Sequence, residues 1–145
     1  MARKEAQLST KIISKWVSKD TATGVAMVQR KKRLSSNCLL CNVPDEDTTH
    51  VLKCQSTSTT LHRNNLMVEL EYWLKSNDTR PDITTFIISG LMKWFDPSIH
   101  ILERNSLDHA MSIAFQNQQI LVWKAFLYGL ISSPIITYQQ RYYLE

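Results

Sequence analysis

Apolar side chains recur at intervals of three and four residues in five long segments of this chain. This spacing predicts amphipathic helices, because positions i, i+3, i+4 and i+7 share one face of an α-helix. The chain holds only three glycines and four prolines, too few for the frequent tight turns of a β-sandwich or barrel. We therefore expect a mostly α fold of four to six helices, with the long ones at residues 5–19, 61–76, 83–95, 107–131 and 134–145.

The apolar stripes also predict which side chains form the core. In the expected helix over 61–76 the stripe consists of Leu61, Leu66, Leu70, Trp73 and Leu74. All four tryptophans of the chain lie on such stripes and are expected inside the fold, namely Trp16, Trp73, Trp94 and Trp123.

Two segments allow more than one interpretation. Residues 83–88 are rich in β-branched side chains, so a strand is the alternative to a helix there. We favour a helix because apolar positions continue at helical spacing as far as Phe95. The long helix over 107–131 is expected to kink before Gly129, and Pro134 is expected to open the last helix.

The segment NCLLCNVPDEDTTHVLKC, residues 37–54, interrupts the helical pattern and contains all three cysteines of the chain. Together with one histidine the cysteines form the pattern Cys38-x2-Cys41-x8-His50-x3-Cys54. Thiolates and imidazole are the usual ligands of zinc, and a tight turn brings the two sulfurs of a Cys-x-x-Cys pair to one ion. The pattern therefore predicts a zinc site.

A helix is expected to carry the second half of this motif. Asp47 or Thr48 can cap its first turn, and His50 and Cys54 then lie on one face because they are four residues apart. His62 is the alternative to His50 as the fourth ligand. The competing interpretation is that these cysteines are ordinary core residues, but their confinement to one short stretch with a suitably spaced histidine favours zinc.

The ligand set predicts the role of the ion. A site closed by three cysteines and one histidine leaves no position for a substrate water, and three thiolates reduce the Lewis acidity of the ion. We therefore expect one structural Zn2+ in a small irregular insert, and no enzyme. An odd number of cysteines, all within the motif, does not fit a disulfide framework, so an intracellular, reducing location is expected.

Positive charge is concentrated before the cysteine segment. Residues 1–36 contain nine lysines and arginines against two acidic side chains, whereas the rest of the chain has a net charge of −3. Such a basic run attracts phosphates, so DNA or RNA is the expected partner, bound with weak dependence on sequence. The candidate phosphate contacts are Arg30, Lys31, Lys32, Arg33, Lys11 and Lys15. A solvated helix face followed by a basic linker is the alternative interpretation of the same charges.

These patterns divide the chain into a basic helical arm at 1–36, the zinc-binding motif at 37–56 and a helical domain at 57–145, within one compact unit. Residues 120–143 are more apolar than a small core requires. An alternative function is therefore a helical protein-interaction or structural domain that pairs with a protein partner or with a second copy through this segment.

The most apolar window is residues 120–136, which is short for a bilayer span and contains Lys124 and Pro134. We therefore expect no membrane partner. The sequence also lacks a Gly-rich phosphate loop and a nucleophile motif, so no small-molecule substrate is expected.

The segment RKKRLSSNCLLCNVPDEDTTHVLKC resembles the cysteine/histidine region near the C-terminal end of the reverse transcriptases of non-LTR retrotransposons. In that family a Cys-x-x-Cys pair is followed by an acidic residue, Thr, His and a final Cys. Asn42 departs from the pattern, since Gly is more usual after the second Cys, and the last Cys comes one residue earlier than in many relatives. The positions that match are Cys38, Cys41, Glu46, Asp47, His50, Leu52 and Cys54.

The resemblance implies a zinc-binding module of a mobile-element protein. The polymerase body of such proteins has no counterpart here, because no Tyr-x-Asp-Asp-type carboxylate pair occurs in the chain. The expected function is thus a non-catalytic, zinc-stabilised accessory module that binds nucleic acid through its basic N-terminal arm.

Overall fold

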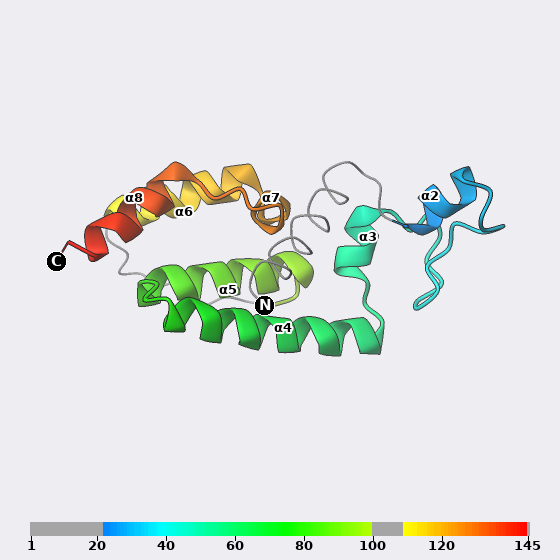
Figure 1. Cartoon of the computed structure of the whole chain (residues 1–145), viewed down its shortest axis with the longest axis horizontal. Helices are drawn as coiled ribbons and strands as arrows, with labels where there is room; N and C mark the ends of the chain where they lie inside the picture. Colours follow the sequence, from blue (N-terminus) through cyan, green and yellow to red (C-terminus); the bar gives the residue numbers. More distant parts are fainter. Residues whose placement is uncertain (1–21, 100–108, 145) are drawn as a thin grey trace, which may run out of the picture. The chain divides into compact units, whose positions relative to one another are not determined.

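The computed structural model describes residues 22–99 and 109–144, and within these residues every regular element is a helix (Figure 1). The mostly α fold class is confirmed. Seven helices occur in the described residues, and four of them have seven or more residues. They are α2 (Gly24–Gln29), α3 (Thr48–Lys53), α4 (Thr57–Ser76), α5 (Pro81–Phe95), α6 (His109–Leu121), α7 (Trp123–Leu127) and α8 (Ser133–Tyr142).

The chain divides into two compact units, which we call the N-terminal unit (Met1–Leu61) and the C-terminal unit (His62–Glu145). The division falls inside α4. The N-terminal unit contains α2, α3 and the irregular cysteine segment between them, whereas the C-terminal unit contains most of α4 and all of α5 to α8. The expected helix over 5–19, with Lys11, Lys15 and Trp16, lies outside the described residues.

α4 and α5 form an antiparallel helical hairpin (Figure 1). The connection is only four residues long, and Asp78 at its centre adopts a left-handed conformation with φ of 51°. Pro81 begins α5 at a position where its missing N–H costs no hydrogen bond. The guanidinium of Arg63, near the start of α4, lies 4.9 Å from the ring centre of Phe95 at the end of α5. This contact joins the start of α4 to the end of α5.

One face of α5 forms the centre of the C-terminal unit. Its buried apolar side chains recur every four residues at Ile83, Ile87, Leu91 and Phe95. This spacing places them along one helical stripe. The strand that residues 83–88 also allowed is therefore not formed, because the apolar periodicity of the whole segment outweighs the β propensity of its first half.

The expected helix over 107–131 is wrong in its continuity. The break at Val122, where φ is 65°, was not expected. The interruption at Gly129, where φ is 82°, agrees with the kink predicted before this residue. The fully buried Gln118 explains why the chain turns back toward α6 after α7. Its amide oxygen accepts the backbone N–H of Ser132 at 2.8 Å. The hydroxyl of Ser132 in turn donates to the carbonyl of Ala114 at 3.3 Å. A straight helix cannot make these contacts, so α6 and α8 pack against each other with α7 in the connection.

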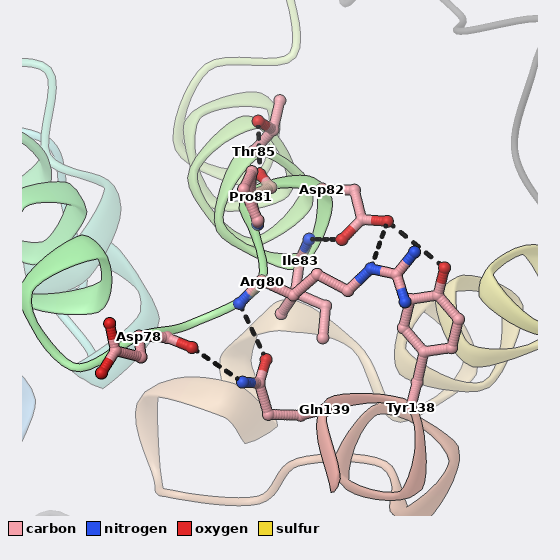
Figure 2. Close-up of polar contacts among 8 residues, drawn as sticks. All are labelled: Asp78, Arg80, Pro81, Asp82, Ile83, Thr85, Tyr138 and Gln139. Atoms are coloured by element: carbon pink, nitrogen blue, oxygen red, sulfur yellow. Dashed lines mark hydrogen bonds and ion pairs between the residues drawn. The ribbon is translucent and has the colours of Figure 1, made fainter. Parts of the chain in front are cut away.

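A polar cluster joins α8 to the turn before α5 (Figure 2). The amide of Gln139 accepts the Arg80 backbone N–H at 2.9 Å and donates to the Asp78 carbonyl at 3.0 Å. Asp82 accepts from the Arg80 side chain at 3.1 Å and from the Tyr138 hydroxyl at 3.3 Å. The Arg80 guanidinium also lies 4.2 Å from the ring centre of Tyr138. These contacts join α8 to the turn before α5.

The predicted inner stripe of α4 is largely wrong. Leu74 is buried, but Leu61, Leu66 and Trp73 are exposed, with 59% of the Trp73 surface accessible. Arg63 takes a place on the buried face instead, where its apolar stem can cover Phe95 while the guanidinium lies over the ring. A sequence pattern that counts arginine as polar therefore assigns the stripe to the wrong side of the helix.

The tryptophans differ in burial, although all were expected in the core. Trp123 is buried, Trp94 is half-buried and Trp73 is exposed. Among the described residues, no helix has both the length and the apolar character that crossing a bilayer requires.

Candidate metal centre

The first two cysteines lie on a tight turn. The backbone N–H of Asn42 donates to the Cys38 carbonyl and the Cys38 N–H donates to the Val43 carbonyl, both at 2.9 Å. The Leu40 N–H approaches the Cys38 sulfur at 3.4 Å. Asn42 has φ of 61°, a left-handed conformation that asparagine tolerates better than most residues other than glycine. This conformation explains how Asn42 can stand where a glycine is more usual.

The other two ligand candidates come from α3. The Asp47 carboxylate caps this helix by accepting the backbone N–H of His50 at 2.6 Å, so of the two caps that the sequence allowed, Asp47 or Thr48, the structure has Asp47. His50 lies within the helix, and Cys54 is the residue that ends it. Because α3 has only six residues, the cap and the centre itself must supply much of its stability.

The turn and the helix bring four side chains together. The ligand atoms of Cys38, Cys41, His50 and Cys54 all lie within 4.8 Å of one another. The sulfurs of Cys38 and Cys54 are 3.9 Å apart, and the Cys41 sulfur is 3.2 Å from Nε2 of His50. Tetrahedral zinc with ordinary Zn–S and Zn–N bonds requires separations of about 3.5–3.8 Å. The cluster can therefore hold one metal ion such as zinc with small adjustments.

Burial and hydrogen bonding act differently on the two buried thiols. Burial raises the pKa of Cys38, and the backbone N–H groups of Leu40 and Cys41 only partly oppose this effect. Burial also disfavours the Cys54 thiolate, but hydrogen bonds from the backbone and hydroxyl of Ser56, together with those from the thiols of Cys41 and Cys38, outweigh it and lower the pKa of Cys54 to about 6. Cys54 therefore offers a thiolate at neutral pH, which is the form that binds metal.

His62, the alternative fourth ligand, is not part of this cluster. It lies on α4 and is exposed, whereas His50 is half-buried beside Cys41. The structure thus favours the set that includes His50.

Sequence reasoning missed the contacts that attach α2 to the cysteine segment. Glu46 accepts the Gly24 backbone N–H on its carboxylate and the Val25 backbone N–H on its carbonyl, both at 3.1 Å. The Glu46 N–H donates to the Ser36 carbonyl at 2.9 Å, and the Ser36 hydroxyl donates to Asp45 at 2.7 Å. Glu46 therefore connects α2, which precedes the basic run at residues 30–33, to Ser36, which follows it. The glycine at position 24 was the available signal, because glycine lowers helix stability and is often used where another group approaches the backbone closely.

Gly24→Ala tests this attachment. A Cβ atom at position 24 would meet the backbone carbonyl oxygen of Ser36 at 2.1 Å, so one of the two segments must move. We expect α2 to detach at a cost of about 1–3 kcal/mol, the usual range for overpacking. The amide of Val25 should then exchange with solvent faster. Gln29→Ala, at an exposed position of the same helix, is the control and should leave this exchange unchanged. Equal exchange in both variants would contradict the attachment.

The basic run lies between α2 and the cysteine turn. Arg30, Lys31 and Lys32 are exposed, and Arg33 is half-buried. The Arg33 guanidinium donates to the Asn37 carbonyl, the residue just before the first cysteine. Four of the six predicted phosphate contacts thus lie within the described residues, and one of them, Arg33, is hydrogen-bonded next to the cluster. The other two, Lys11 and Lys15, lie outside the described residues.

The chain was also compared with known proteins. No family model, curated protein or solved structure matches it.

Proposed function

We propose that this chain is a non-catalytic, zinc-stabilised module that binds nucleic acid through its basic run, Arg30–Arg33. In this proposal Cys38, Cys41, His50 and Cys54 hold one structural zinc ion. The ion fixes the fold of the cysteine segment and takes no part in a reaction, because four protein ligands fill a tetrahedral site.

One observation carries the proposal, namely the attachment of the basic run at both of its ends. On one side, α2 hydrogen-bonds to Glu46, which is next to the cap of α3. On the other side, Arg33 hydrogen-bonds to the residue before Cys38. A run held at two points loses less conformational freedom on binding than a free tail does, so each phosphate contact costs less.

The resemblance to the cysteine/histidine region of retrotransposon reverse transcriptases supports the same proposal. Two of its matching acidic positions have structural roles here, since Glu46 holds α2 and Asp47 caps the helix of His50. We propose that the chain derives from the accessory region of such a mobile-element protein.

The salt dependence of binding tests the proposal. Four phosphate contacts release about four counterions, so log K should fall with log salt with a slope of about −3.6 for duplex DNA and about −2.8 for single strands. Contacts by Lys11 and Lys15 would steepen both slopes. Replacing Arg30, Lys31, Lys32 and Arg33 together with alanine should weaken binding to every sequence alike and flatten the slope by the same amounts.

A charge-matched variant controls for the loss of four positive charges. Lys75, Lys93, Lys124 and Arg141 all belong to the C-terminal unit, and their replacement by alanine changes the net charge equally. This variant should keep the original slope, and both variants should keep the zinc content of the parent protein. Binding that survives loss of the basic run, or no binding to DNA or RNA at low salt, would contradict the proposal.

A second candidate function is protein interaction through residues 120–143. Several large apolar side chains of this segment are exposed in the structure, namely Ile120, Leu121, Val122, Leu130, Ile131 and Ile136. Surface of this kind is typical of sites that contact a partner or a second copy. Sedimentation of the purified chain over a range of concentrations separates the two functions, because self-association through this segment is independent of added nucleic acid.

A further inference from the structure

An open hollow of about 530 Å3 lies against the cysteine turn. Both of the first two cysteines and the two leucines between them form one wall. The remaining lining comes from the basic run and the residues that flank the turn, which are Arg33, Ser35, Asn37 and Asn42. The lining therefore combines apolar side chains, two side-chain amides and one guanidinium in one small surface.

The two leucines of the turn are unusually exposed for apolar residues. Leu39 is 81% and Leu40 is 62% accessible, although each sits next to a cysteine of the buried cluster. Their position is determined by the turn, because the sulfurs of Cys38 and Cys41 must point to the cluster and the residues between them must then point away.

We propose that this hollow receives an unpaired base of a single-stranded nucleic acid, with Leu39 and Leu40 against the face of the base. A nucleobase has two apolar faces and a polar edge, which matches a wall of leucines beside the amides of Asn37 and Asn42. A base within a duplex is stacked on both faces and cannot enter. The proposal rests on the nucleic-acid function proposed above and adds that the nucleic acid bound at this site is single-stranded.

The charges around the hollow also favour a nucleic acid as the occupant. Zinc with three thiolates and a neutral imidazole carries one negative charge, which opposes phosphate. Four positive side chains precede the turn, and Arg33 itself lines the hollow. Its guanidinium uses one donor on the Asn37 carbonyl, and a guanidinium has five. An apolar surface of a partner protein would not be complementary to this concentration of positive charge.

The experiment compares a 12-nucleotide single strand, as DNA and as RNA, with the matching duplex at one salt concentration. The protein is the zinc-loaded full chain and its Leu39→Ala/Leu40→Ala variant, followed by fluorescence anisotropy. We expect the variant to bind both single strands about 5- to 10-fold more weakly, the lower end of the range for base stacking, because leucine has no π face. Duplex affinity should change less than twofold.

Leu61→Ala/Val68→Ala is the matched control, because these two side chains are exposed to 63% and 68% and do not line the hollow. It should bind like the parent protein. A second measurement needs no variant: the methyl resonances of Leu39 and Leu40 should shift by ring currents when the single strand is added, and should not shift with duplex.

The outcomes separate the two proposals. Equal weakening on single strands and duplex, or unshifted leucine methyls, overturns the base-binding hollow and leaves phosphate binding by the basic run in place. No binding of the parent protein to either strand form overturns both. A difference between the DNA and RNA arms, with the leucine dependence retained, supports the hollow and identifies which of the two is its ligand.

Discussion

Replacing Cys41 with serine is expected to abolish zinc binding and to unfold residues 35–56. A serine hydroxyl remains protonated at neutral pH and does not replace a thiolate as a zinc ligand. Structural zinc sites of this kind contribute on the order of 10–16 kcal/mol of apparent binding free energy, much of it as local folding. The loss therefore exceeds what residues 35–56 can tolerate, because the one helix within them, α3, has only six residues.

Elemental analysis of protein purified with reductant and added zinc measures this effect directly. We expect one zinc ion per chain in the parent protein and none in the Cys41→Ser variant. His62→Ala is the control, because His62 is exposed and stands outside the cluster, and it should retain one zinc ion. A metal-free parent protein under these conditions would contradict the zinc site. Loss of zinc in the His62 variant but not in the Cys41 variant would show that His62 is a ligand and Cys41 is not.

The unfolding should stay local. The C-terminal unit has its own core on α5, α6 and α8, and none of its buried side chains belongs to the cysteine cluster. Circular dichroism of the Cys41→Ser variant, or of the parent protein with a chelator, should therefore retain most of the helical signal. Loss of nearly all of it would show instead that the two units unfold as one.

The cysteine cluster could be predicted from sequence because its geometry is set by local spacing. Two residues between Cys38 and Cys41 define a turn, and the step from His50 to Cys54 is one helical turn after a capping aspartate. The first half of the site, Cys38 to Cys41, is thus determined within four residues of chain, and the second, Asp47 to Cys54, within eight. The same is true of α5, whose first turn begins with proline and whose buried residues recur at a constant interval.

The parts that could not be predicted depend on contacts between distant residues. Gln118 looks like a surface residue of a helix, and only its hydrogen bond to the backbone of Ser132 shows why the chain breaks at Val122. Arg63 carries a charge, and only its contact with Phe95 shows that it belongs to the inner face of α4. Side-chain polarity alone indicates the wrong surface at both positions.

Trp123→Ala is expected to destabilise the C-terminal unit by about 3–5 kcal/mol, the usual cost of removing a buried large aromatic residue. The Trp123 indole packs directly on the backbone of α5, since a Cβ at Gly90 would lie 1.9 Å from its Cζ2 atom. Its ring centre is 5.0 Å from that of Phe86 and 5.7 Å from that of Phe126. The structure around α5 cannot easily fill the cavity that remains.

Trp73→Ala provides the matched control, because it removes the same side chain from an exposed position of α4. Exposed substitutions usually change stability by less than about 0.5 kcal/mol, so this variant should unfold close to the parent protein. For a unit of this size the Trp123 variant should melt at least about 12 °C lower. Zinc content should be unchanged in both, because neither tryptophan contributes to the cluster.

Equal melting temperatures for the two variants would contradict the packing of α7 on α5. A large loss at Trp73 would mean that the outer face of α4 is covered in solution, and would make that face, together with residues 120–143, the first place to look for a partner.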